Sequence, residues 1–218
     1  MAAQETVEHD IRIPLRNEPM QARSTARLAT LLDAAAAIVD EIGFERLTTA
    51  MVADRAGASI GTVYRYFPDR ITLLQALGAR NLERVLTRVS DEIVDPKHPD
   101  WVSALNSAFG ILVEAFRSEP GFRALRVGDV IDLRPSPLER TYNSIVAQRL
   151  LDGLIQRFGI VDGPEVRLLF ETAIEVSDAL AARAFARDSN GDEAFLTAGR
   201  DIVYAMLVDH LGTVGAPE

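Results

Sequence analysis

The chain has 218 residues, which fits one domain of generous size or two small ones. Hydrophobic residues make up 48% of it, so a chain that is disordered throughout is excluded. It contains no cysteine, which excludes disulfide bonds, thiolate metal sites and cysteine catalysis. No apolar run approaches the roughly 18 residues of a membrane span, and the polar N-terminus lacks an export signal. We therefore expect a cytoplasmic protein with no membrane partner.

The net charge of −9 argues at first sight against binding to nucleic acid. The charges are unevenly distributed, however. Residues 11–80 hold nine Arg against seven Asp and Glu, whereas residues 81–218 hold 14 Lys and Arg against 22 Asp and Glu. An acidic C-terminal part would repel DNA and leave the N-terminal third as the side that DNA approaches. This asymmetry is modest and does not identify a DNA-binding protein by itself.

Residues 1–22 contain two prolines and no hydrophobic periodicity, and we interpret them as a flexible N-terminal arm. From Ser24, a candidate N-cap, apolar residues recur at helical spacing until Gly43. Further helices follow between Gly, Pro and Asn signals, and no stretch alternates with period two as a strand would. The expected helices cover residues 24–42, 49–56, 60–67, 70–94, 100–118, 121–130, 137–158, 164–187 and 192–211.

Residues 48–74 read TTAMVADRAGASIGTVYRYFPDRITLL. Two short helices joined by a three-residue turn that begins with Gly57 cross at a steep angle, which is the helix-turn-helix arrangement. On the second helix, Val63 and Phe67 lie one turn apart and should face the core. The free backbone N–H groups after Ser59 attract anions, as the N-terminus of a helix does.

The opposite face of that second helix should then present Thr62, Arg65 and Tyr66, which carry hydroxyls and a guanidinium but no acid. Such a face suits phosphate oxygens and base edges. Simpler interpretations exist, with Tyr64 as packing and Arg65 as a solvated charge. Ile60 fits either the core or an apolar contact with a thymine methyl group.

The stretch from Arg23 to Leu74 resembles the DNA-binding domain of the TetR family of transcriptional regulators. About fifty residues match in order and spacing, and the resemblance ends near Leu77. Beyond it, only length and helicity are similar. The matching segments are Leu31–Ala35, Ile42–Phe44, Leu47–Thr49, Val52–Ser59 and, most specifically, Gly61–Arg70.

The resemblance implies a role in DNA binding for nine residues. Those implied to present the recognition helix to the major groove are Ser59, Ile60, Gly61, Thr62 and Arg65. Those implied to contact or hold the DNA backbone are Thr49, Tyr64, Tyr66 and Arg70. The family usually has lysine where Arg70 stands, and arginine keeps the charge with bidentate geometry. Because Ala50 replaces a base-reading side chain of some members, sequence preference would come from the recognition helix, with arginines of the arm as a second candidate and an inert arm as the alternative.

The resemblance also implies an all-α fold of about nine helices. A flexible arm (1–22) precedes a three-helix helix-turn-helix domain (23–77) and a larger helical regulatory and dimerisation domain (78–218). The expected partners are a double-stranded DNA operator, a second copy of the chain and a small-molecule effector, with repression as the family's usual mode. The surplus of apolar residues in 164–187 and 192–211 also favours pairing with the same helices of a second chain.

Two interpretations of the effector site remain open. In the first, aromatic residues of 100–118 and 137–158 line a pocket whose polar points suit an anionic ligand. The residues of this pocket would be Trp101, Phe109, Phe116, Tyr142 and Arg149. In the second, an acidic stripe of Glu171, Glu175 and Asp178 at helical spacing favours a cationic ligand. Both compete with ordinary core packing and a solvated acidic edge.

Two other classes of protein are alternatives to a regulator. An enzyme is disfavoured because the sequence has no GxSxG, HExxH, Walker or GxGxxG motif, and its three histidines lack ligand spacing. No metal or cofactor is expected. A helical small-molecule binding module without DNA activity is the second alternative, and the intact run from Thr62 to Phe67 argues against it.

Overall fold

The computed structural model describes residues 22–119, 121–123 and 141–212 of the chain. Within these residues it contains eight α-helices, one 3-10 turn and no strand, so the all-α prediction is confirmed. The elements are α1 (Ala22–Ile42), η1 (Phe44–Arg46), α2 (Thr49–Arg55), α3 (Ile60–Tyr66), α4 (Arg70–Val94), α5 (Trp101–Ser118), α7 (Tyr142–Phe158), α8 (Pro164–Arg187) and α9 (Glu193–Leu211).

Most predicted helix ends agree with the structure, and two differ. Helix α1 begins at Ala22, so Ser24 lies inside its first turn and is not its cap. Helix α7 begins at Tyr142 because Thr141 is the N-cap, with an extended backbone and a side chain that accepts from the amide of Ser144. The predicted arm and most of the helix predicted at 121–130 lie outside the described residues.

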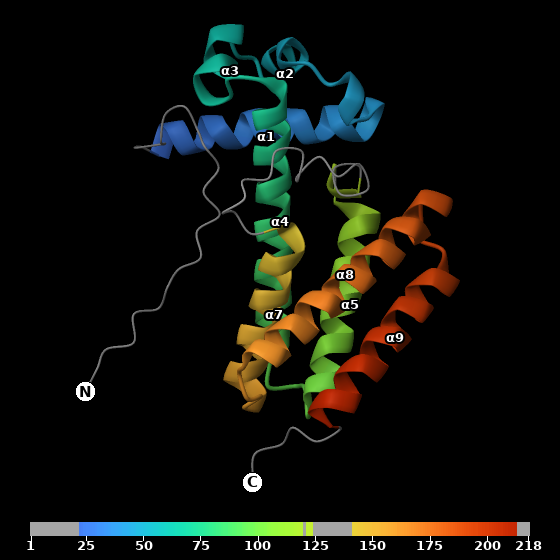
Figure 1. Ribbon diagram of the computed structural model, residues 1–218. Helices are drawn as coiled ribbons and strands as arrows, with labels where there is room; N and C mark the ends of the chain where they lie inside the picture. Colours follow the sequence, from blue (N-terminus) through green and yellow to red (C-terminus); the bar gives the residue numbers. More distant parts are fainter. Residues whose placement is uncertain (1–21, 120, 124–140, 213–218) are drawn as a thin grey trace, which may run out of the picture.

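Helix α4 connects two hydrophobic clusters. Its first half packs with α1, α2 and α3 through Leu73, Leu74 and Leu77, around which the N-terminal cluster forms. Its second half enters the C-terminal cluster through side chains such as Leu86 and Val89. In Figure 1, α4 runs from the N-terminal helices down into the bundle of α5, α7, α8 and α9. A movement of α4 relative to the bundle would therefore change the packing of both the N-terminal and the C-terminal cluster.

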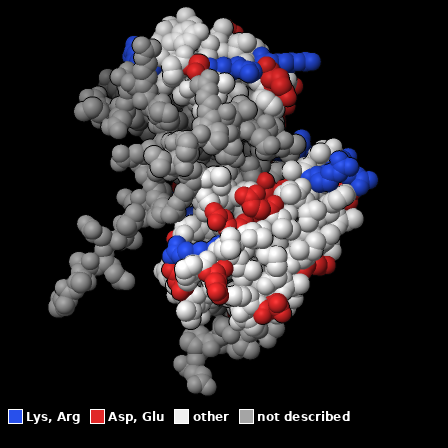
Figure 2. Space-filling model, viewed as in Figure 1, with Lys and Arg blue, Asp and Glu red and all other residues white. Residues whose placement is uncertain are grey.

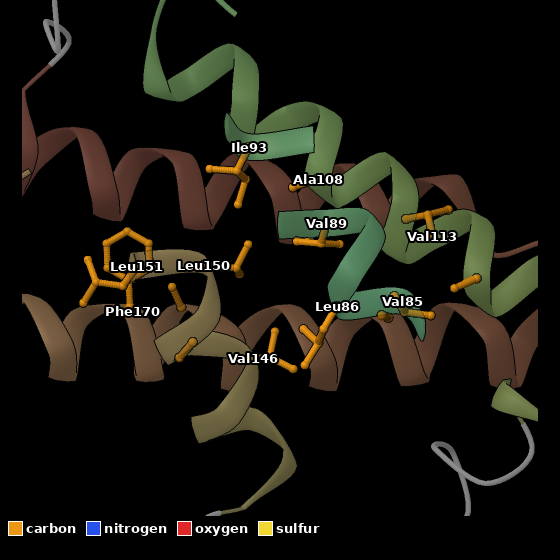
Figure 3. Close-up of a cluster of buried hydrophobic side chains, with 14 of the residues drawn as sticks. Val85, Leu86, Val89, Ile93, Ala108, Val113, Val146, Leu150, Leu151 and Phe170 are labelled. Atoms are coloured by element: carbon orange, nitrogen blue, oxygen red, sulfur yellow. The ribbon is translucent and has the colours of Figure 1, made fainter. Parts of the chain in front are cut away.

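The C-terminal cluster is built from the facing sides of the bundle helices. Figure 3 shows aliphatic side chains of α4, α5 and α7 converging, with Leu86 beside Val146. Several members have no exposed surface, among them Val89, Ile93 and Leu154. Close packing of this kind holds the helices in one arrangement, which gives the bundle a defined interior.

Candidate nucleic-acid interface and internal cavity

The turn between α2 and α3 has the geometry of a helix-turn-helix. Helix α2 ends in a Schellman motif, in which the amide of Ala58 donates to the carbonyl of Ala53 and that of Gly57 to Asp54. Gly57 has φ +56°, a left-handed conformation that glycine adopts without strain. Ser59 then caps α3 by accepting from the amide of Thr62 at 3.1 Å. These local contacts fix the angle at which α3 leaves the turn.

The exposed side of α3 carries most of the predicted DNA-binding residues. Val63 and Phe67 have no exposed surface, as predicted, and Ile60 and Tyr64 are 43% and 45% exposed. Arg65 is also exposed and makes no hydrogen bond or ion pair with any described residue. This guanidinium is therefore available to a phosphate or a base.

Thr49 and Tyr64 lie together although they belong to different helices. The hydroxyl of Thr49 donates to the hydroxyl of Tyr64 at 3.4 Å, which brings the first turn of α2 against α3. Two hydroxyls at one point of the surface can share a single phosphate group. Ser59 and Thr62 form a second such pair at 2.9 Å at the start of α3, where Gly61 adds no side chain.

Tyr66 does not lie where the sequence pattern placed it. The prediction that it points away from the core is wrong, since only 7% of it is exposed. Its hydroxyl lies 3.0 Å from Oγ of Ser24 and donates to the carbonyl of Ser24. The hydroxyl of Tyr66 therefore links α3 to the first turn of α1 by hydrogen bonds, and its ring is part of the N-terminal cluster.

Arg70 has an intramolecular role that the sequence did not reveal. Its Nη1 donates to the carbonyls of Phe44 and Glu45, at 3.1 and 2.8 Å, and so closes the η1 turn between α1 and α2. A second such contact joins Arg55 of α2 to Glu41 of α1 in a bidentate pair. Hydrogen bonds from Arg55 lower the pKa of Glu41, and both side chains are partly exposed to solvent. Both arginines thus help to position α2.

A cavity of about 90 Å³ lies inside the bundle, between α5, α7, α8 and α9. Four of the residues predicted to line an effector pocket are found in its wall, namely Trp101, Phe109, Phe116 and Tyr142. Mostly apolar internal cavities with a few polar groups are the usual form of small-molecule sites. Phe116 stacks on Phe185 and meets Phe122 edge-on, which extends the wall beyond the cavity itself.

Arg149 and Glu175 are absent from the cavity wall, so the prediction that they face a pocket is wrong for both. Arg149 points to α4, where it pairs with Glu83 at 3.3 Å. Glu175 lies on the outer side of α8 and accepts a hydrogen bond from Asn143 at 2.8 Å. Of the acidic stripe, Asp178 alone reaches the cavity, whereas Glu171 lines a separate polar depression beside α7.

The outer side of α8 and α9 exposes apolar side chains. Leu168 is 65% exposed and Ile202 48% exposed. Figure 2 shows this face as a broad area with few charged residues. None of the helices that the structure describes is long and apolar enough to cross a membrane. No group of three or more potential metal-binding side chains occurs in the described part of the chain.

Two family models together match most of the chain. Residues 31–77 match "Bacterial regulatory proteins, tetR family", and residues 99–211 match "Tetracyclin repressor-like, C-terminal domain". Among solved structures, a TetR-family transcriptional regulator from Streptomyces coelicolor is 31% identical. The similarity covers 84% of this chain and 98% of that one, with a TM-score of 0.71. A regulator from Pectobacterium atrosepticum has the same fold, at 22% identity and a TM-score of 0.65, covering 90% and 99% of the two chains.

Among curated proteins, the KstR repressors match over shorter segments of the chain. The transcriptional repressor KstR of Mycobacterium tuberculosis is 34% identical over 94 residues, which is 43% of this chain and 42% of that protein. KstR of Rhodococcus jostii is 40% identical over 62 residues, 28% and 29% of the two chains. The chain thus matches less than half the length of these two transcriptional repressors. With both domain models matched in order, the chain belongs to the TetR family of transcriptional regulators.

Proposed function

We propose that the chain is a repressor that binds a palindromic operator as a dimer and releases it when a small molecule enters the cavity. The observation that carries this proposal is the exposed, acid-free surface of α3, where Arg65 has no partner among the described residues. An unpaired guanidinium on an acid-free surface would have no role in a protein that bound only a small molecule.

In the proposed complex, α3 enters the major groove with its N-terminal turn foremost. Ile60, exposed at the first position, would contact a thymine methyl group, and Arg65 would bind a base edge or a phosphate. The paired hydroxyls of Thr49 and Tyr64 would hold a phosphate. Tyr66, being buried, would act only by positioning α3.

Dimerisation would use the outer side of α8 and α9. The exposed Leu168 and Ile202 lie on these two helices, and covering their surroundings with the same face of a second chain would remove apolar surface from water. A stable interface of this kind buries on the order of 1,200–2,000 Å². The two-fold axis would place the two α3 helices about 34–36 Å apart, or a further helical turn, on a symmetric site.

A route for effector release runs through the turn after α5. Phe116 lines the cavity and meets Phe122 with ring centroids 5.2 Å apart. Next to Phe122, Gly121 lies against α1 and α4, where an added Cβ would be in ordinary contact, 3.5 Å from the Val39 side chain and 3.7 Å from that of Leu77. A ligand that displaced Phe116 would therefore press on the helices that carry the DNA-binding surface.

The proposal is tested by gel shift with the DNA upstream of the chain's own gene. A salt-dependent shift that is lost in an Arg65→Ala, Tyr64→Phe double variant is expected, because charge neutralisation at phosphates makes DNA binding sensitive to salt. If the DNA migrates at the same rate with and without protein at low salt, the chain is a helical binding module without DNA activity.

A further inference from the structure

The wall of the bundle cavity is almost entirely hydrophobic. Eighteen of the 23 residues that line it are hydrophobic. Six of these are aromatic, namely Trp101, Phe109, Phe116, Tyr142, Phe170 and Tyr204. An ionised group moved into such surroundings loses its hydration and gains few polar contacts in return. The wall therefore disfavours any ligand whose charge would have to be buried.

The polar residues of the wall come from all four helices. They are Asn106, Asn143, Ser177, Asp178 and Arg200. The side chain of Asn143 donates a hydrogen bond to Glu175 of α8, one turn before Asp178. A ligand in the cavity would meet hydrogen-bonding groups at these residues and apolar surface elsewhere.

The two charged residues of the described wall, Asp178 and Arg200, both take part in interactions of their own. Arg200 is 48% exposed and pairs at 3.5 Å with Asp201, which is not part of the wall, and Asp178 also has a partner. Arg149, which would have favoured an anion, pairs with Glu83 outside the cavity. Glu175, which would have favoured a cation, is on the outer side of α8. A charged ligand would therefore have to displace an existing partner to gain a counter-charge in the described wall.

The cavity is also small. Its volume of about 90 Å³ is smaller than the roughly 150 Å³ of an apolar cavity that accepts benzene, so a single ring fits only when a wall side chain such as Phe116 moves. We infer that the effector is an uncharged, mainly apolar molecule of at most about one ring in size, with a hydroxyl or carbonyl group for the polar residues of the wall, and that it enters by displacing Phe116. This inference rests on the proposed function for its link to DNA release, but ligand binding itself can be measured separately.

The inference is tested by thermal unfolding of the full chain at pH 7 with three probes of matched shape. 4-Methylphenol is uncharged, 4-methylbenzoate is an anion and 4-methylbenzylammonium is a cation. Ligand binding to the folded state raises Tm by mass action, by about 5 °C when the ligand is well above its Kd. We expect this rise with millimolar 4-methylphenol and less than about 1 °C with either ion. No rise with the phenol, or an equal or larger rise with an ion, would overturn the inference.

A substitution that fills the cavity tests whether the probe binds there. The variant Ala181→Leu places a larger side chain in the wall of the cavity, where Ala181 is 9% exposed. The matched control is Ala147→Leu, since Ala147 on α7 is also buried, at 3% exposed, but lines no part of the cavity. The response to 4-methylphenol should disappear in Ala181→Leu and persist in the control. If Ala181→Leu does not fold, Ala173→Val fills the same wall with a smaller side chain.

A full response in a folded cavity variant would show that the probe binds elsewhere and would overturn the site. The link to function is read separately, by gel shift with the same probes. If 4-methylphenol raises Tm but leaves DNA affinity unchanged, the ligand class is supported and the proposed effector release is contradicted.

Discussion

Removing one hydroxyl from each of two neighbouring tyrosines should separate folding from DNA binding. Tyr66 is buried and its hydroxyl bonds to Ser24, whereas Tyr64 is 45% exposed and touches only the exposed hydroxyl of Thr49. Both Tyr→Phe changes keep the ring, so neither creates a cavity. The two variants therefore differ in the contact that is lost: a hydrogen bond within the fold for Tyr66, and a surface hydroxyl that can bind DNA for Tyr64.

For Tyr66→Phe, the lost contact is one intramolecular hydrogen bond, worth about 1 kcal/mol. The Oγ and carbonyl of Ser24 at the start of α1 lose a partner, but Ser24 is only partly buried and keeps access to water, so the cost should not exceed this range. In a chain of this size, about 1 kcal/mol corresponds to a fall in Tm of roughly 2–4 °C. Affinity for DNA measured at 15 °C, well below unfolding, should change by less than about threefold.

For Tyr64→Phe, the free energy of unfolding should stay within about 0.5 kcal/mol of wild type, as for other exposed positions. A hydrogen bond to a phosphate is charge-assisted and worth about 1.5 kcal/mol, and a dimer makes two, so DNA affinity should fall about 100-fold. The slope of log K against log salt should not change, because a neutral hydroxyl releases no counterion. Urea unfolding and fluorescence anisotropy, at one protein concentration, measure the two quantities. A loss of affinity in Tyr66→Phe that matches or exceeds that in Tyr64→Phe would refute this division of roles.

Four further outcomes are expected. Arg65→Ala should relax preference at one base position if Arg65 binds a base, and equal losses on specific and random DNA in anisotropy would assign it to phosphate alone. Arg70→Ala should lower Tm by a few degrees because the η1 turn loses two hydrogen bonds, and a melt unchanged from wild type would contradict that role. Ile202→Asp should give a monomer in light scattering, whereas Met51→Asp, at an exposed apolar position on α2 outside the α8 and α9 face, should remain a dimer. Gly121→Ala should cost about 1 kcal/mol through its left-handed φ of +73° and weaken the DNA response to ligand, and an unaltered response would exclude this turn as the route.

The features that the sequence predicted well are those set by neighbours along the chain. The cap at Ser59, the stop at Gly57 and the buried pair of Val63 and Phe67 each depend on a few residues, and each is found in the structure. The helix-turn-helix follows from them almost completely. Long glycine- and proline-marked helices were also placed within a few residues of their observed ends, apart from the start of α7.

The errors concern contacts between distant segments. Tyr66 lies three residues after the buried Val63, a spacing at which two residues share a helix face, but nothing nearby in sequence indicates that the start of α1 covers it. Arg149 and Tyr142 share one stripe of α7, but α7 packs against both α4 and α8, so one stripe faces two partners. Glu175 lies beside the cavity-lining Ile174 on α8, a helix with weak segregation of polar and apolar residues. Helical periodicity identifies a face but not the neighbour that covers it.

Selection of DNA by the full chain from a random-sequence pool tests the central claim most directly, since it assumes no operator. The account predicts enrichment of a two-fold symmetric sequence whose half-sites are centred 10–10.5 bp apart, or a multiple of that spacing. The Tyr64→Phe, Arg65→Ala double variant, altered only on the exposed side of α3, should not enrich it. No enrichment by the wild-type chain, or the same enriched sequence from the double variant, would contradict the claim that the surface of α2 and α3 binds DNA.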